Sequence, residues 1–311
     1  MLCPHCGREY TLPRCACGFD GTRDCAAFPT LMAVVRKDWQ QVCRDPDAPI
    51  QWMDPVVEDA VREELEKREG PITCQQAGEV TQLFLFSEEL RTLQDLVWLK
   101  NLDELQIACR CVPDLTPLTK LPQLTSLHLI ESDITDLSPL TKLPGLEYLT
   151  LSGRGVTDLS ALNALSELKS LTLSDCGAID LSTLAGLKEL QLLSIKNSSI
   201  TDFAPLAKLP GLVWLVLQDC RIADLSSLAG LTQLRSLNLR HNEIADLTPL
   251  AGLTQLKSLN LWHNKITDLT PLQNLTELKH LYVDDNRIAD FSPIKALIPQ
   301  LESYSNEDQQ V

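Results

Sequence analysis

From Val80 to Pro299 the sequence repeats itself every 22 residues, and ten successive blocks align without an insertion or a deletion. A single block has nothing to cover its apolar stripe, so neighbouring blocks must stack against one another. The repeat therefore predicts a solenoid whose stability belongs to the whole array. The apolar positions are one, four, six, eleven, fourteen, seventeen and twenty, as in Leu234, Leu237, Leu239, Ile244, Leu247, Leu250 and Leu253.

Each block contains the signals of one strand and one short helical turn. Positions three to seven alternate with period two, which is typical of a strand whose fourth and sixth residues are buried. Stacking the blocks places these strands in a parallel sheet. Position fifteen is usually Ser or Thr and position sixteen is usually Pro, as in Ser138-Pro139 and Thr248-Pro249. This pair indicates an N-cap followed by the first residue of a short, 3₁₀-like helix on the convex side.

Two columns of polar or thiol residues have structural interpretations. Position thirteen is Asp in nine consecutive blocks, and Asp commonly accepts a hydrogen bond from a backbone N–H two residues on. We therefore expect a turn device rather than a catalytic group at Asp114, Asp136, Asp158, Asp180, Asp202, Asp224, Asp246, Asp268 and Asp290. Position nine is expected to bond neighbouring backbone inside the coil, and it holds Cys176, Cys220, Asn242, Asn264 and Asn286.

The blocks follow the L-x-x-L-x-L-x-x-N/C-x-L signature of leucine-rich repeats. Their length and the Asp-Leu-Ser/Thr-Pro-Leu step resemble the bacterial internalin type of leucine-rich repeat, and the resemblance covers about two thirds of the chain. It implies an α/β fold, a right-handed horseshoe with a parallel sheet on the concave side and short 3₁₀ or helical turns on the convex side. It also implies that a partner protein binds the concave side.

Composition limits the cellular compartments and the classes of partner to be expected for this chain. The chain has 311 residues and a net charge of −15, and it lacks an apolar run long enough to span a membrane. Eleven cysteines are an odd number, and the N-terminus shows no apolar targeting segment. These features favour a reducing cytoplasm and no membrane association. The negative charge disfavours nucleic-acid binding, which depends on neutralising phosphates with Lys and Arg.

Residues 1–27 carry two cysteine pairs in a segment that is too short to fold by hydrophobic burial. Cys3 and Cys6 form a C-x2-C knuckle, and Cys15 and Cys17 form a tighter C-x-C pair. Four thiolates at this density suit a tetrahedral structural zinc ion, so we predict a zinc-ribbon-like knuckle. The shorter second pair leaves His5 or Cys25 open as a substitute ligand, and loose free thiols are the alternative.

The segments on either side of the repeats are predicted to close the solenoid. Residues 28–79 contain two stretches with apolar residues at helical spacing, over 29–44 and 54–68, and a solenoid needs such a cap over its first turn. The ten repeats occupy residues 80–299. Residues 300–311 are predicted to form an amphipathic closing turn that ends in a frayed tail from Asn306 onward.

Exposed positions of the predicted strands are rich in side chains that concentrate binding energy at interfaces. Positions three, five, seven and eight carry four of the five histidines in the chain. The predicted partner-binding residues are Phe84, Phe86, His128, Tyr148, Trp214, Arg240, His241, Trp262, His263, His280, Tyr282 and Asp284. His241 and His263 stack with Asp285 in adjacent blocks, where interface use is favoured over metal chelation or a pH-sensitive contact.

We predict a non-catalytic adaptor or scaffold that docks an unidentified partner protein on the concave sheet. Two alternatives stay open at this point. One is a nucleic-acid-associated regulator acting through the zinc ribbon, although residues 1–24 are not basic overall. The other is a cysteine-dependent enzyme or effector, for which the sequence offers no Gly-rich phosphate loop and no nucleophile with a recognisable base.

Overall fold

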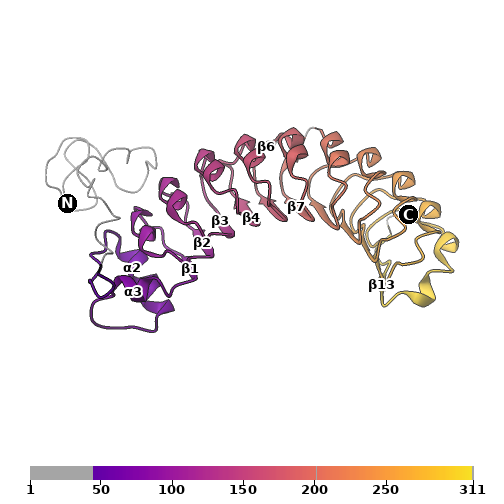
Figure 1. Cartoon of the computed structure of the whole chain (residues 1–311). Coiled ribbons are helices and arrows are strands. Elements are labelled where there is room, and N and C mark those ends of the chain that lie inside the picture. Colours follow the sequence, from indigo (N-terminus) through magenta and orange to yellow (C-terminus); the bar gives the residue numbers. More distant parts are fainter. Residues whose placement is uncertain (1–44, 201, 310–311) are drawn as a thin grey trace, which may run out of the picture.

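The computed structural model describes residues 45–200 and 202–309. These residues form an arc in which the strands lie along the inner side and the helical turns along the outer side (Figure 1). One parallel sheet of 11 strands runs the length of the arc. Its strands are β1 Gln82–Leu85, β2 Glu104–Ala108, β3 Ser126–Ile130, β4 Tyr148–Ser152, β5 Ser170–Ser174, β7 Leu192–Lys196, β9 Trp214–Gln218, β10 Ser236–Asn238, β11 Ser258–Asn260, β12 His280–Tyr282 and β13 Ser303–Ser305.

Strand register from β1 to β12 follows the sequence period, because each paired residue lies opposite the residue 22 positions further along. Leu127 pairs with Leu149, and Leu237 pairs with Leu259. The fourth and sixth positions of the blocks therefore form continuous columns of buried leucine and isoleucine in one core. The predicted parallel solenoid is confirmed for the described residues. A second, two-stranded sheet joins β6 Ala178–Ile179 to β8 Ser199–Ile200.

The outer side consists of short 3₁₀ helices, one in each of the first nine repeats and two between β12 and β13. Each of the nine Asp residues at position thirteen accepts a hydrogen bond from the backbone N–H two residues on, at 2.8 to 2.9 Å. The helices are η3 Gln94–Trp98, η4 Thr116–Lys120, η5 Ser138–Lys142, η6 Ser160–Ala164, η7 Leu181–Gly186, η8 Ala204–Lys208, η9 Ser226–Leu228, η10 Thr248–Leu250, η11 Thr270–Leu272, η12 Ser292–Ile294 and η13 Ile298–Gln300.

The hydrogen bonds of the position-thirteen Asp residues are confirmed, but the prediction that position fifteen is the N-cap is wrong. Ser138 and Thr248 were expected to be N-caps, but each is the first residue of its 3₁₀ helix. The capping carboxylate comes from Asp136 or Asp246, two residues earlier. Hydrogen bonds from Ser138 also hold the pKa of the Asp136 carboxyl below its ordinary value.

Position nine binds backbone inside the coil, as predicted. The Asn264 amide donates to the carbonyls of Leu239, Leu261 and Trp262, and its oxygen accepts the N–H of Ile244. Cys220 takes the equivalent place earlier in the chain, where its thiol lies near the carbonyls of Ile195 and Gln218. Each of these side chains satisfies groups from two successive turns and so ties the turns together.

Position eight adopts the left-handed backbone conformation in every repeat from the third to the tenth. The residue types fit this role, because Asn, Asp and His are the non-glycine residues that most often adopt a positive φ. The column comprises Glu131, Gly153, Asp175, Asn197, Asp219, His241, His263 and Asp285. Gly153 also lies so close to the Ser132 carbonyl that a Cβ atom would overlap it.

The N-terminal described segment contributes two helices, α2 Pro55–Glu64 and α3 Cys74–Ala77. Asp54 is the N-cap of α2 and accepts the N–H of Val56, and Val57 and Val61 are fully buried in the same core as the first leucines of the sheet. The helix predicted over 54–68 is therefore present and packs against β1. The helix predicted over 29–44 lies outside the described residues.

At the other end, β13 extends the sheet beyond the ten repeats. Leu281 pairs with Tyr304, a spacing of 23 residues instead of 22. Gln309 then replaces the position-nine asparagine, because its amide oxygen accepts the N–H of Ile288 and its nitrogen donates to the Val283 carbonyl. Residues 306–309 are thus held by hydrogen bonds, which corrects the expected frayed tail. The domain boundaries proposed from the sequence stay predictions.

Candidate binding surface on the concave sheet

The concave sheet exposes large aromatic side chains, as the sequence predicts. Phe84, Phe86, Tyr148, Trp214 and Trp262 are exposed, with Phe86 at 62% and Trp214 at 45%. Phe84, Tyr148 and Trp214 lie on strands β1, β4 and β9, Phe86 follows β1 directly, and Trp262 lies two residues after β11. Odd positions of the repeat point away from the leucine core at these places. His128, Arg240, His241, His280, Tyr282 and Asp284 are half-buried, and His263 is exposed.

These side chains form separate groups along the arc rather than one patch. Phe84 and Phe86 stack with ring centroids 6.2 Å apart at the N-terminal end of the sheet. Trp214 occupies the middle of the sheet, where it pairs in register with Leu192 on one side and Ser236 on the other. Trp262 lies further along and meets His241 edge to face, with centroids 4.8 Å apart.

His241, His263 and Asp285 lie together, and local bonding explains their arrangement. The two rings are 4.8 Å apart, and His263 Nδ1 is hydrogen-bonded to the Asp285 carboxylate. All three residues belong to the left-handed column at position eight, so the backbone accounts for part of their residue types. No group of three or more His, Cys, Asp or Glu side chains suited to a metal ion occurs in residues 45–200 and 202–309.

A column of charged residues borders the sheet at position two, immediately before each strand. Side chains in this column contact the next repeat, as shown by Lys169 Nζ, which lies 2.7 Å from Glu147 Oε2. From the second repeat to the tenth, the column changes from acidic at Asp103 to basic at Lys257 and Lys279. We call it the marginal column: Asp103, Thr125, Glu147, Lys169, Gln191, Val213, Arg235, Lys257 and Lys279. It was not among the predicted partner-binding residues, although aligning the repeats displays its change of sign.

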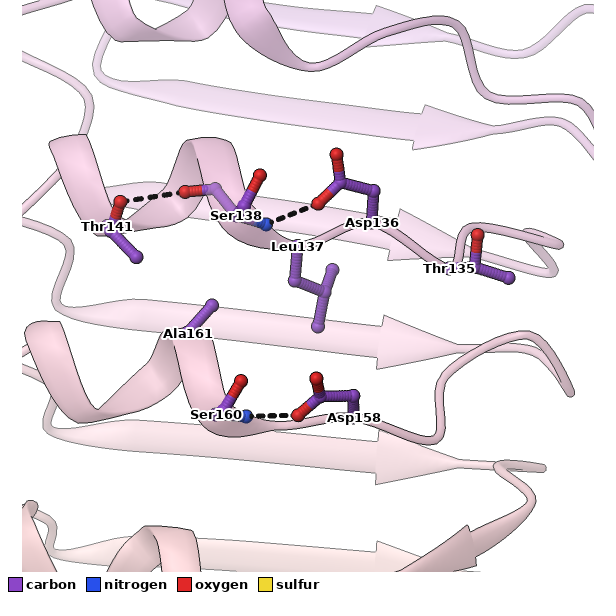
Figure 2. Close-up of a pocket in the computed structure, with 8 residues that line it drawn as sticks. All are labelled: Thr135, Asp136, Leu137, Ser138, Thr141, Asp158, Ser160 and Ala161. Atoms are coloured by element: carbon purple, nitrogen blue, oxygen red, sulfur yellow. Dashed lines mark hydrogen bonds between the residues drawn. The ribbon is translucent and has the colours of Figure 1, made fainter.

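The outer side carries hollows between successive 3₁₀ helices, and their polar groups are engaged in capping. In one of them, Asp136 accepts the Ser138 N–H and Asp158 accepts the Ser160 N–H (Figure 2). The hollow is lined by Thr135, Asp136, Leu137, Ser138, Thr141, Asp158, Ser160 and Ala161. Because these carboxylates already accept backbone N–H groups of the turns, we assign the hollow a structural role and not a catalytic one.

The buried cysteines of the repeats are poor nucleophiles. Burial raises the pKa of the Cys176 thiol to about 11, and burial also raises that of Cys220 to about 11. A thiol with such a pKa is almost entirely protonated at neutral pH, and the thiolate is the reactive form. The predicted zinc ligands Cys3, Cys6, Cys15 and Cys17 lie outside the described residues, so the zinc knuckle stays a prediction.

The comparisons with known proteins agree with the repeat architecture. The family described as "Leucine Rich repeats (2 copies)" matches residues 210–252 and 254–296. An internalin (InlF) from Listeria monocytogenes is 33% identical, with a TM-score of 0.72 over 83% of this chain and 76% of that chain. The chain belongs to the internalin-like leucine-rich repeat proteins. No curated protein matches its sequence.

More distant structures share the architecture of this internalin-like protein. A leucine-rich repeat protein of Leptospira interrogans is 24% identical, with a TM-score of 0.65 over 76% of this chain and 63% of that chain. The receptor in a TLR13–ssRNA13 complex is 26% identical, with a TM-score of 0.57 over 68% of this chain and 34% of that chain. Within the described residues, no helix combines the length and apolarity needed to cross a membrane.

Proposed function

We propose that this internalin-like protein is a non-catalytic adaptor that binds a partner protein on its concave sheet. The observation that carries the proposal is the exposure of five large aromatic side chains on or beside the sheet, at Phe84, Phe86, Tyr148, Trp214 and Trp262. The fold can hide such side chains, because each strand also has an inward face. Their outward placement therefore has to be explained by something other than folding.

The energetics of interfaces support this reading. Buried Trp, Tyr and Arg side chains dominate the binding energy of protein interfaces. Trp214 and Trp262 stand on a rigid sheet, so little conformational entropy is lost when a partner covers them. The likeness to internalin and receptor structures supports a binding role for the fold.

Two parts of the proposal concern the N-terminal end of the solenoid. α2 acts as the N-terminal cap, because Val57 and Val61 cover the apolar edge of the first repeat. A structural zinc ion held by Cys3, Cys6, Cys15 and Cys17 stabilises the segment that precedes this helix. Metal analysis of the purified protein tests the second part: about one zinc per chain is expected, and none after Cys3→Ser and Cys6→Ser.

The RNA-bound TLR13 structure raises nucleic acid as a competing ligand for this fold. The charge of this chain argues against it, because the net charge is −15 and the sheet carries no Lys or Arg at positions two, three, five, seven or eight of the second, third and fourth repeats. A nucleic acid lying along the arc would meet carboxylates there instead of the cations that its phosphates need.

The double variant Trp214→Ala/Trp262→Ala tests the proposed docking face. Affinity purification from the native cell, quantified by mass spectrometry, should recover a partner with the wild type and lose it with the variant, while the circular dichroism spectrum stays unchanged. Met53→Ala is the matched control, because Met53 is an equally exposed apolar side chain outside the sheet. Undiminished recovery with the double variant would place the binding site elsewhere.

A further inference from the structure

Two regions of the concave sheet, which we call its acidic end and its basic end, carry opposite charge; beyond the basic end, the tenth repeat holds Lys279 against Asp284 and Asp285. In the second and third repeats the exposed sheet positions and the marginal column hold three carboxylates, Asp103, Glu104 and Glu131, and no Lys or Arg. In the eighth and ninth repeats the same positions hold Arg235, Arg240 and Lys257 and no Asp or Glu. The basic end runs against the overall charge of −15, so the average composition does not explain it.

The cations at the basic end have no acidic partner within the described part of the chain. No carboxylate there lies within ion-pair distance of Arg235, Arg240 or Lys257, and the Nε of Arg240 is buried without a hydrogen-bond acceptor. Carboxylates in these repeats and the next one have other partners: Glu243 pairs with Lys265 at 2.7 Å, Asp284 accepts the Glu307 N–H, and Asp285 bonds His263.

The acidic end is likewise little neutralised. Glu104 Oε1 lies 3.8 Å from His128 Nε2, and the Asp103 carboxylate accepts a hydrogen bond from the Thr125 hydroxyl but has no cationic partner among the described residues. Glu131 is exposed and has no ion-pair partner among the described residues. By contrast, Glu147 in the next repeat is paired with Lys169, which marks the place where the acidic region ends.

Distance keeps the two ends electrically independent. Seven strand steps separate β2 from β11, and at about 4.8 Å per step this is roughly 34 Å. Charges in physiological salt are screened over about 8 Å. The fourth to seventh repeats hold Lys169 and Lys196 against Glu147, Asp175 and Asp219 at these positions, a net charge of only −1. They also present Leu192, Trp214 and Val216.

We propose that the concave sheet binds an elongated segment of a partner protein whose own charge is polarised, with a basic end, an apolar middle and an acidic end. The acidic end of this segment lies over Arg235, Arg240 and Lys257, its apolar middle over Trp214, and its basic end over Asp103, Glu104 and Glu131. A helix of about 22 residues spans the required distance at 1.5 Å per residue. The inference rests on the proposed docking face and adds the chemistry and the direction of what docks there.

Two synthetic helical peptides of identical composition provide the probe. The first carries a Lys block, an apolar centre with Trp and Leu, and a Glu block; the second has the same residues with alternating charges. Fluorescence anisotropy at 50 mM salt should show tighter binding of the block peptide by about tenfold, because several exposed ion pairs form together. The advantage should shrink at 500 mM salt as the charges are screened. Equal affinities at low salt would overturn the proposal.

Charge-reversal variants of the protein show which of its residues cause the tighter binding of the block peptide. Arg235→Glu/Lys257→Glu should weaken the block peptide by about tenfold and leave the alternating peptide within about twofold. Lys120→Glu/Lys142→Glu is the matched control, because it makes the same charge change on exposed residues of the outer turns. An equal loss in this control would show that only net charge matters and would reject a local basic end.

A photoreactive group at the Glu end of the block peptide shows in which direction the peptide lies along the sheet. Cross-links should map to the eighth and ninth repeats. Cross-links to the concave side of the second and third repeats would refute the polarity and leave the proposed docking face standing. Cross-links confined to the outer turns would refute both.

Discussion

At the residue scale, a few buried polar side chains hold the turns of the solenoid together. Asn264 satisfies three carbonyls and one N–H from two successive turns, and Asn242 and Asn286 repeat the arrangement. The sequence predicts this role because the residues recur at a fixed position between buried leucines. It does not predict the left-handed conformation of position eight, since Asp, Asn, His and Glu at an exposed position also suit a solvated or binding surface.

Asn264→Ala should strongly destabilise the protein. The substitution leaves the buried Ile244 N–H without its acceptor and removes one of the two amide donors from each of the Leu239 and Leu261 carbonyls. The expected cost is about 3 kcal/mol in the free energy of unfolding. Urea unfolding followed by circular dichroism measures the loss. Asn274→Ala, at an exposed position, is the control and should change stability by less than about 0.5 kcal/mol. Similar losses in the two variants would contradict the role assigned to Asn264.

At the scale of elements, two buried aspartates join α2 to the first repeat. Asp95, in η3, accepts the N–H groups of Met53 and Asp54 at 2.8 Å, and Asp54 accepts those of Arg91 and Thr92. The Asp95 Oδ1 atom is buried without a hydrogen-bond partner. The sequence could not reveal this junction, because its two halves lie about 40 residues apart and neither belongs to the repeated pattern.

Asp95 should make this junction weaker at neutral pH than in mild acid. Desolvation, together with the nearby charges of Asp54 and Glu58, raises the pKa of Asp95 from 3.8 to about 6. Between about pH 4 and pH 6 the folded state therefore binds more protons than the unfolded state. The contribution of this group to stability is then greatest below pH 4 and is lost as pH rises through 6.

Asp95→Asn keeps an oxygen for the two N–H groups and removes the buried charge. The variant should be more stable than the wild type at pH 7.5 by about 2 kcal/mol, and the difference should vanish near pH 4. Urea unfolding at both pH values measures it. Asp59→Asn, an exposed change on the same helix, should show no such dependence. A wild type that is the more stable protein at pH 7.5 would contradict the assignment.

At the scale of the whole molecule, an unbroken period determines most of the architecture. Fixed spacing sets the strand register, the core columns and the outer turns, so these features could be predicted from the sequence. The eleventh strand could not, because Tyr304 follows Leu281 at 23 residues and Gln309 replaces the expected asparagine. The exposure of the aromatic residues could be predicted from their strand positions. The opposite charges of the two regions could not, because the structure is needed to show that the marginal column borders the sheet.

Docking of a partner protein on the concave sheet is the function proposed for this chain. Its most direct test is photo-cross-linking in the native cell, with a photoreactive amino acid placed in turn at Ser236 and Ser258 on the sheet and at Gly230 and Gly252 outside it. A Cβ atom added at either glycine meets nothing within 4 Å and points into open space, so a side chain placed there is expected to preserve the fold. If a partner docks on the sheet, the same cross-linked protein should be recovered from both serine positions and none from either glycine. Cross-links from the glycine positions alone would contradict it.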